Sequence, residues 1–240
     1  GGGAGAELLC VHQDEAIPVP EGLSFIEAAA IPEAFLTAFD AAVTQGGLSA
    51  GDWLAVNAVG SGVGTALVQI ARFKGAKVIG SSRTQTKLDF THPLGLTAPV
   101  LGSSDELANA TIEATQGRGA DVVIDLVGGP GLKALVGALA PRGTLILVGL
   151  LGGARAELPL ATLLTKRLRV QGTVLRSRGH DEKRELAHTF CRDLITAFTG
   201  STPALRPVID RVIPWQDVAQ GHRALENHAT AGKIVLEHTA

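Results

Sequence analysis

The sequence lacks most of the features that mark specialised classes of protein. Its 240 residues contain no methionine, no tyrosine and only two cysteines, Cys10 and Cys191. Two cysteines are too few for a disulfide scaffold or a four-cysteine zinc site, so we expect a reduced, cytoplasmic chain. The longest apolar run, residues 145–151, has the length of a strand and falls well short of the roughly 20 residues of a membrane helix. No signal peptide is recognisable at the start of the sequence.

An excess of positive charge is also missing. The 21 basic residues nearly balance 23 acidic ones, which gives a net charge of −2. A general nucleic-acid binder or membrane-surface binder would carry a basic face, so neither kind of partner is expected. The apolar content of 45 % is typical of a globular core, and 240 residues form one large domain or one domain with part of another. Because the chain opens on three glycines without a methionine, we expect that its natural N-terminus lies elsewhere.

Short apolar segments alternate with helical patterns through the middle of the chain. The apolar segments predict strands over residues 53–59, 77–80, 122–127 and 144–148. Helical spacing predicts helices over residues 63–74, 84–94, 105–115 (capped by Ser104) and 132–140. Strands without polar alternation are buried on both faces. We therefore expect an α/β fold with a doubly wound, Rossmann-like parallel sheet and helices on each side.

Further elements are expected on either side of this alternation. Ser24 and Glu27 have the spacing of a capping box, which predicts a helix that Pro32 ends. A second helix is expected over residues 33–44. Later patterns predict an edge strand at 169–175, a long helix at 182–198, and strands at 208–213 and 234–237 around a helix near 215–227.

A glycine-rich turn between the first predicted strand and the next helix is the sharpest local signal. Residues 57–64 read NAVGSGVG, which places Gly60, Ser61, Gly62, Val63 and Gly64 where a dinucleotide site would be. Small residues let the backbone approach a pyrophosphate, and the N-terminus of a helix offers free N–H groups. The spacing is G-x-G-x-G rather than the strict G-x-G-x-x-G, so a tight turn with packing glycines remains an alternative.

The end of the second predicted strand bears on the choice between NAD and NADP. An acidic residue there would bind the ribose 2′-hydroxyl, but residues 80–87 read GSSRTQTK and contain no acid. Arg83 and Lys87 offer positive charge instead, and a guanidinium can bind a 2′-phosphate through two parallel hydrogen bonds. This segment favours NADPH, although Arg83 and Lys87 as ordinary solvated residues at a helix start are the alternative.

Two more glycine turns follow the third and fourth predicted strands. Gly128 and Gly129 end one strand, and Gly149, Gly152 and Gly153 follow the other. Ligands of open α/β sheets sit at the carboxyl ends of the strands, so these turns are expected beneath the adenine ribose and the nicotinamide. Plain loop glycines are the alternative interpretation.

Five segments carry a family resemblance. They read AAAIPEAFLTA (28–38), SGVGTA (61–66), GRGADVVID (117–125), LRSR (175–178) and GKIVL (232–236). In this order and spacing, the sequence resembles the zeta-crystallin-type quinone oxidoreductases of the medium-chain dehydrogenase/reductase superfamily. The resemblance runs through most of the chain, although no single segment is decisive.

The resemblance implies an NADPH-dependent, zinc-independent reductase of quinones or related conjugated carbonyls. Matching the segments implies pyrophosphate contacts from Ser61, Gly62 and Val63, 2′-phosphate contacts from Arg83 and Lys87, and nicotinamide contacts from Gly128, Gly149 and Leu150. It also places Thr37, Leu175 and Ser177 near the nicotinamide or the substrate, and assigns no catalytic residue. Members of this family usually dimerise through the edge strand expected here at residues 169–175, so a homodimer is expected.

The chain departs from the family pattern at its start. Relatives begin with a β-rich GroES-like substrate domain, of which residues 1–22 resemble only the end and residues 205–240 the C-terminal return. Residues 23–204 would form the dinucleotide-binding domain. A tyrosine that many relatives place over the nicotinamide has no counterpart, because the chain contains none. We expect either that a partner or a fuller natural chain supplies the missing part, or that this is an isolated cofactor-binding fragment.

Other chemistry finds less support in the sequence. Cys10 and His12 are too few ligands for zinc, so no metal site is expected. Valines flank Ser61 where a hydrolase G-x-S-x-G elbow needs glycines, which argues against nucleophilic catalysis. Asp125 lies in an apolar strand, where a satisfied buried carboxylate is favoured over a ribose contact. Cys191 lies on a long helix and is expected to serve packing.

Hydride transfer to a quinone needs little acid–base help from the protein, because the nicotinamide supplies the hydride and a quinone takes protons from water. A quinone reductase is therefore the first hypothesis. An enoyl reductase, free-standing or as a module of a polyketide synthase, is the second. A catalytically silent NADPH-binding module and a protein–protein scaffold are the alternatives from other classes.

Overall fold

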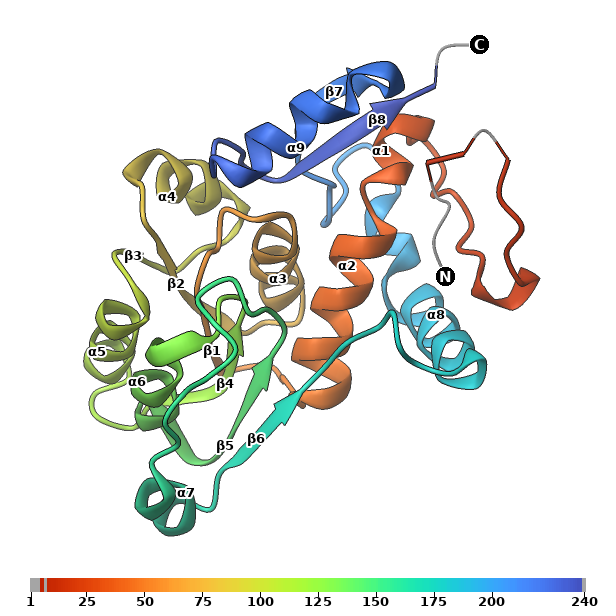
Figure 1. Cartoon of the computed structure of the whole chain (residues 1–240). Coiled ribbons are helices and arrows are strands. Elements are labelled where there is room, and N and C mark those ends of the chain that lie inside the picture. The colour runs from red at the N-terminus through yellow and green to blue at the C-terminus, as the bar shows by residue number, and fades with distance from the viewer. Residues whose placement is uncertain (1–4, 7, 239–240) are drawn as a thin grey trace.

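A six-stranded parallel sheet lies at the centre of the fold (Figure 1). The computed structural model describes residues 5–6 and 8–238. The strands are β1 (Trp53–Val56), β2 (Lys77–Ser82), β3 (Ala98–Leu101), β4 (Ala120–Asp125), β5 (Leu139–Leu147) and β6 (Arg169–Gly172). Their order is β3-β2-β1-β4-β5-β6, and each neighbouring pair is parallel. This order is the one of dinucleotide-binding doubly wound sheets, so the predicted fold class is confirmed.

Alternating side chains of each central strand enter two separate cores. On β1, Leu54 and Val56 join one hydrophobic cluster, while Ala55 between them joins the other. The first cluster packs against α2 (Pro32–Phe39), α3 (Gly62–Phe73) and α8 (His180–Leu194). The second packs against α5 (Ser104–Ala114) and α6 (Leu132–Gly137), on the opposite face (Figure 1). Because both faces of the sheet are covered, most residues of β1, β2, β4 and β5 are buried.

The remaining elements connect or flank these layers. They are η1 (Gln13–Glu15), α1 (Phe25–Ala29), a π-helical turn η2 (Asp40–Gln45), α4 (Gln85–Thr91), 3-10 turns η3 (His92–Leu94), η4 (Gly129–Gly131), η5 (Ile195–Phe198) and η6 (Trp215–Asp217), α7 (Leu160–Lys166) and α9 (Val218–Glu226). The capping box at α1 is present as expected, since Ser24 Oγ accepts the Glu27 N–H and the Glu27 carboxylate accepts the Ser24 N–H. Within the described residues, no helix combines the length and apolarity needed to cross a membrane.

Several boundaries differ from the sequence expectations for local reasons. Ser103, not Ser104, caps α5, because its hydroxyl and the Glu106 carboxylate form a second capping box. The helix expected to reach residue 140 ends at Gly137, and Leu139 already belongs to β5. Strand β3 was not expected, since it is a four-residue edge strand that contains Pro99 and is exposed at alternate positions. The expected strand at 53–59 ends at Val56, where the glycine turn begins.

The C-terminal segment forms a two-stranded parallel ribbon, β7 (Ile209–Pro214) with β8 (Lys233–Glu237), joined by α9. The ribbon lies against the glycine turn, because the N–H of Gly232 donates to the carbonyl of Gly60 at 2.9 Å and Ser61 bridges to Gly232. The division into residues 1–22, 23–204 and 205–240 stays a prediction. Residues 1–4 and 7 of its first part lie outside the described residues.

Candidate functional site

The turn after β1 presents the open end of a helix. Ser61 caps α3 with its hydroxyl, which accepts the N–H of Gly64 at 3.0 Å. In the first turn of this 12-residue helix, the N–H of Val63 has no hydrogen-bond partner among the described residues, and the N–H of Gly62 faces only the carbonyl of Gly232, through the bridge between Ser61 and Gly232. Unpaired donors of a helix N-terminus attract anions, and the helix dipole adds to this attraction. The turn therefore has the geometry that a pyrophosphate requires.

The glycines of this turn serve different purposes. A Cβ on Gly64 would lie 2.6 Å from the carbonyl oxygens of Ala58 and Val59, so Gly64 lets the helix pack on the turn. A Cβ on Gly60 would lie 2.9 Å from Cβ of Lys87. At Gly62, an added Cβ would overlap Cδ of Lys233, a flexible side chain rather than backbone. The backbone surface of Gly62 is therefore covered mainly by the flexible side chain of Lys233, with the carbonyl oxygen of Gly232 at 3.6 Å from the added Cβ. Gly60 and Gly64, in contrast, are needed for packing.

Lys233 is a cation of this site that sequence reasoning did not identify. It begins β8, its stem lies against Gly62, and its Nζ pairs with Glu33 of α2. In the sequence, Lys233 is noticeable only as part of the segment GKIVL. Its pairing with Glu33 could not be predicted, because 200 residues separate the two. A lysine over the open end of α3 adds positive charge where phosphates would bind.

Two more cations gather at the end of β2. Arg83 is exposed, and Nζ of Lys87 donates to the carbonyl of His228 at 2.9 Å. Burial and the positive charge of Arg83 lower the pKa of Lys87, while the carboxylate of Asp210 opposes this shift. No described side-chain hydrogen bond or ion pair joins Arg83 to an acid. The structure thus brings the two expected cations together, and a phosphate would relieve their mutual repulsion.

A buried polar pair connects the glycine turn to the turn after β4. Oδ1 of Asp125 accepts Nδ2 of Asn57 at 2.6 Å and the N–H groups of Val127 and Gly128 at 2.9 and 2.8 Å. Oδ1 of Asn57 accepts the N–H of Leu126 at 2.7 Å. These contacts favour the structural interpretation of Asp125. Its second oxygen, Oδ2, is buried and has no partner in the described part of the chain.

The turns expected at the nicotinamide half pack on one another. A Cβ on Gly128, which has a φ of +69°, would lie 2.8 Å from the carbonyl oxygen of Gly149 and 3.1 Å from Cδ2 of Leu150. The N–H of Gly152 donates to the carbonyl of Val127 at 2.8 Å. The structure therefore brings Gly128, Gly149 and Leu150 together at the carboxyl edge of the sheet.

An ion pair between Asp40 and Arg178 lies beside the remaining expected site residues, Thr37, Leu175 and Ser177. Local sequence patterns did not predict this pair. Asp40, 1 % exposed, accepts two hydrogen bonds from the Arg178 guanidinium at 3.0 and 2.6 Å, and one from Thr173. This pair raises the pKa of Arg178. It fastens the segment that carries Leu175 and Ser177 to the end of α2, one helical turn beyond Thr37. Leu175 packs on the first hydrophobic cluster, and Ser177 is exposed.

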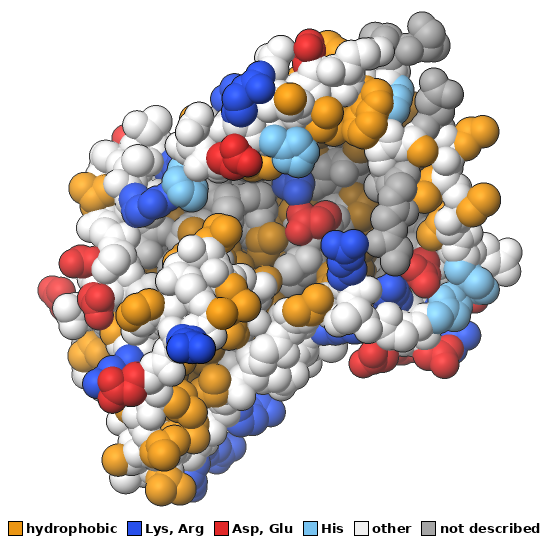
Figure 2. Space-filling model, in the orientation of Figure 1, with side chains coloured by type: hydrophobic (Ala, Val, Ile, Leu, Met, Phe, Trp, Pro, Cys, Tyr) orange, Lys and Arg blue, Asp and Glu red, His pale blue; other side chains and the backbone are white. Residues whose placement is uncertain are grey.

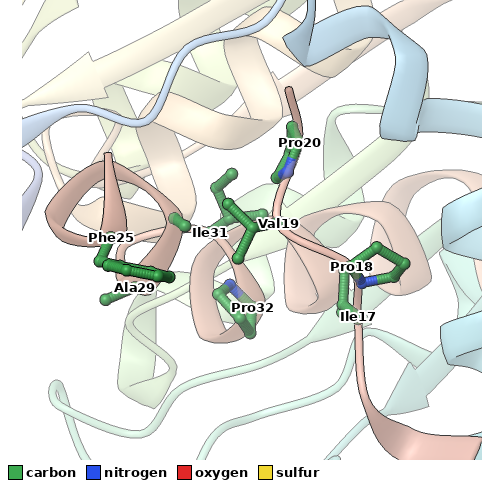
Figure 3. A pocket seen from close by; sticks show the side chains of 9 residues that line it. Ile17, Pro18, Val19, Pro20, Phe25, Ala29, Ile31 and Pro32 are labelled. Carbon is green, nitrogen blue, oxygen red and sulfur yellow. The ribbon is translucent and has the colours of Figure 1, made fainter. Parts of the chain in front are cut away.

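Other potential sites lie away from these residues. Figure 3 shows an open apolar pocket of about 300 Å³ beside α1 and α2. Its lining consists of Ile17, Pro18, Val19, Pro20, Phe25, Ala28, Ala29, Ile31 and Pro32, none of them an expected cofactor contact. Burial raises the pKa of the Cys191 thiol, which disfavours a role as nucleophile. By contrast, charged side chains gather along a hollow between the C-terminal ribbon and the sheet (Figure 2).

Known proteins are similar to this chain over most of its length. Residues 62–191, more than half of the chain, match the family model of zinc-binding dehydrogenases. A quinone oxidoreductase-like protein 2 homolog of Nematostella vectensis is 28 % identical over 98 % of this chain and 64 % of its own length. A highly reducing polyketide synthase of Aspergillus terreus is 31 % identical over 92 % of this chain and 8 % of its own length.

Solved structures have the same fold. An NAD-dependent alcohol dehydrogenase aligns with a TM-score of 0.82 and 31 % identity, over 99 % of this chain and 66 % of that one. A mycobacterial protein complexed with NADPH aligns with a TM-score of 0.77 and 25 % identity, over 91 % of this chain and 66 % of that one. The chain thus spans about two thirds of the length of such relatives. On its sequence match and its fold, it belongs to the zinc-binding dehydrogenase family, within the medium-chain dehydrogenase/reductases that the sequence resembled.

Proposed function

We propose that this chain is the cofactor-binding part of an NADPH-dependent oxidoreductase that transfers hydride to quinones or related conjugated carbonyls without zinc. The observation that carries the proposal is the open end of α3, flanked by Lys233, together with the absence of an acid in residues 80–87. Free N–H groups and three cations suit a dinucleotide with an extra phosphate. A carboxylate in place of Arg83 would have favoured NADH.

Each part of the cofactor has candidate contacts. The N–H groups of Gly62 and Val63 and the ammonium of Lys233 would bind the pyrophosphate, and Arg83 and Lys87 the 2′-phosphate. The packed turns with Gly128, Gly149 and Leu150, together with Thr37, Leu175 and Ser177, would hold the nicotinamide half. When bound, the nicotinamide supplies the hydride. The protein then has to orient the ring and exclude water, which requires no metal ligand or catalytic acid.

A second function, enoyl reduction, is favoured by one observation, the similarity to a polyketide synthase over 92 % of this chain. The cofactor would bind in the same way, but the acceptor would be a carbon–carbon double bond conjugated to a thioester carbonyl. A third possibility follows from the chain's length, because it spans 64 % of the quinone oxidoreductase-like relative. The chain by itself would then bind NADPH without turnover.

One set of assays distinguishes these functions. Calorimetry with NADPH and NADH measures binding, and absorbance at the nicotinamide band follows oxidation with a quinone or an enoyl thioester as acceptor. The proposal expects tighter binding of NADPH than of NADH, and consumption with the quinone. Consumption only with the thioester would favour the enoyl reductase, and binding without consumption the silent module. Absence of binding to either nucleotide would overturn all three.

We also propose that two copies of the chain pair through β6. This strand is an edge of the sheet, all four of its residues are exposed, and Val170 is 37 % exposed. An unpaired edge strand presents free backbone groups that are suited to antiparallel pairing with a second copy. Light scattering tests the proposal with Val170→Pro, which removes a backbone donor from the edge. A dimer is expected for the unmodified chain and a monomer for the variant, and a monomer in both cases would contradict the proposal.

A further inference from the structure

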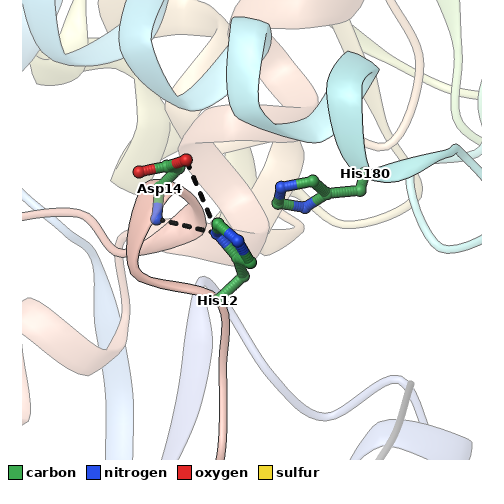
Figure 4. Close-up of side chains that lie close together, drawn as sticks. All are labelled: His12, Asp14 and His180. Carbon is green, nitrogen blue, oxygen red and sulfur yellow. Dashed lines mark hydrogen bonds and ion pairs between the residues drawn. The ribbon is translucent and has the colours of Figure 1, made fainter.

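Two histidines far apart in the sequence meet at the surface beside α8. His12 precedes η1, and His180 is the first residue of α8. Their ring centroids lie 4.0 Å apart with an interplanar angle of 55°. Asp14 lies beside them, with Oδ2 3.6 Å from Nδ1 of His12. Figure 4 shows the three side chains directed toward a common point between the N-terminal segment and the helix.

The donor atoms of this trio have the spacing of a metal site. One ligand atom from each of His12, Asp14 and His180 lies within 4.8 Å of the other two, and no other group of this kind occurs in the part of the chain that is described. Nitrogen ligands bind zinc at about 2.0–2.1 Å, which puts neighbouring ligands roughly 3–3.5 Å apart. Because all three side chains are at least one third exposed, small rotations suffice to close this difference.

A fourth residue orients one of the ligands. Nδ1 of His180 lies 2.8 Å from Oε1 of Glu15. A carboxylate on one imidazole nitrogen leaves the other, Nε2, for a metal, and this carboxylate–histidine arrangement recurs around zinc.

The surrounding charges favour a cation as well. Asp14 and Glu15 lie in η1, and Asp181 and Glu182 lie in the first turn of α8. The opposing cations are Lys183, which acts on Glu15, and Arg184, which pairs with Asp181 at 3.1 Å. Two imidazoles and a carboxylate suit zinc, copper or nickel rather than calcium or magnesium, which prefer oxygen ligands.

We propose that His12, Asp14 and His180 form a binding site for Zn²⁺, with Glu15 as the residue that positions His180. In the described chain, the Glu15–His180 contact is the one hydrogen bond that connects η1 to a distant element. A bound ion would therefore fasten the N-terminal segment to α8. The site is built from η1 and α8, not from the carboxyl edge of the sheet, so it is independent of the proposed hydride transfer and has a structural role.

Calorimetric titration of the chain with ZnCl₂ at pH 7.5, in a buffer without chelating groups, tests the site. One ion per chain is expected, and His180→Ala, which removes a ligand, should weaken binding by at least about 100-fold, more than the loss of an outer-shell partner. Glu15→Gln, which alters only the positioning residue, should weaken it by about tenfold. His188→Ala is the matched control, because His188 is an exposed histidine on the same helix outside the trio.

Two further readouts identify the ligands. Co²⁺ in place of Zn²⁺ should give visible absorption bands that are altered in His12→Ala and His180→Ala but not in His188→Ala. Zn²⁺ at 100 times its dissociation constant should raise the Tm by about 5 °C, an increase that EDTA reverses. No stoichiometric binding by the unmodified chain, or an equal loss in His188→Ala and His180→Ala, would overturn the proposal.

Discussion

The six-stranded sheet and the C-terminal ribbon contribute to the candidate site in different ways. The interior residues of β1 and β4 are completely or almost completely buried, whereas most residues of β7 and β8 are exposed or half-buried. The sheet positions the glycine turn. The C-terminal segment supplies Lys233, whose side chain lies against Gly62, and the carbonyl of His228, which accepts a hydrogen bond from Lys87. The comparison indicates that the stability of the fold resides mainly in the sheet, while the ribbon mainly completes the site.

The largest effect is expected on the free energy of unfolding, when a leucine of the sheet and a leucine of the C-terminal segment are each replaced by alanine. Leu54 on β1 is 0 % exposed and Leu225 on α9 is 51 % exposed. Leu54→Ala should lower the free energy of unfolding by about 3 kcal/mol, since it removes buried methyl groups and leaves a cavity. Leu225→Ala should change it by less than about 0.5 kcal/mol. Denaturant unfolding measures both, and similar losses would show that the ribbon is part of the cooperative core.

The next effect concerns the cations at the end of β2. Replacing Arg83 and Lys87 together by Ala should weaken NADPH binding by about 100-fold, because two charge-assisted hydrogen bonds of roughly 1.5–3 kcal/mol each are removed and water recovers part of this energy. NADH lacks the 2′-phosphate and should lose much less. Calorimetry with both nucleotides measures the ratio. Equal losses for the two would refute the assignment of these residues to the 2′-phosphate.

Lys233 provides the contrasting case within the ribbon. Because the pyrophosphate is common to both nucleotides, Lys233→Ala should weaken NADPH and NADH alike, by about tenfold, the loss of one charged contact. The free energy of unfolding should change little, since the ion pair of Lys233 with Glu33 is at the surface. Binding measured beside denaturant unfolding separates the two effects. A loss confined to NADPH would place Lys233 at the 2′-phosphate instead.

The elements that could be predicted from the sequence depend on neighbouring residues. The capping box of Ser24 and Glu27 spans three residues, and the turn at 57–64 lies between two strongly patterned elements. The alternation of buried strands and helices was sufficient to predict the parallel sheet. Strand β3 was missed because it is only four residues long and contains a proline. For such a short edge strand, pairing with β2 outweighs its weak local preference.

Contacts between distant residues could not be predicted in the same way. Asp40 and Arg178 are 138 residues apart, and Glu15 and His180 are 165 apart. No periodicity or local spacing connects such residues, because only the folded sheet brings α2, α8 and the N-terminal segment together. The glycine turn was identified from its own sequence, whereas Lys233, which completes it, was noted only as part of a segment resembling the family.

The smallest effect is expected for two similar capping boxes, one on a helix that covers the sheet and one on a helix that contacts the ribbon. Ser103 and Glu106 cap α5, whose Leu107 is buried in the second core, while Ser24 and Glu27 cap α1, which has no buried residue and contacts β8. Ser103→Ala should lower the free energy of unfolding by about 1 kcal/mol, a typical value for a lost cap. Ser24→Ala should cost less, because α1 can fray without exposing the core.

The stability of these two variants should also depend differently on pH. The Ser103 hydroxyl, followed by its backbone N–H, lowers the pKa of Glu106, and for Glu27 the backbone N–H of Ser24 contributes most. A lowered folded-state pKa gives stability that is present above the unfolded value of 4.5 and lost as the pH falls through the folded value. Denaturant unfolding at pH 7 and pH 3 should therefore show the deficit of Ser103→Ala shrinking at low pH, more than that of Ser24→Ala. A deficit that grows on acidification would contradict the role of these carboxylates in capping.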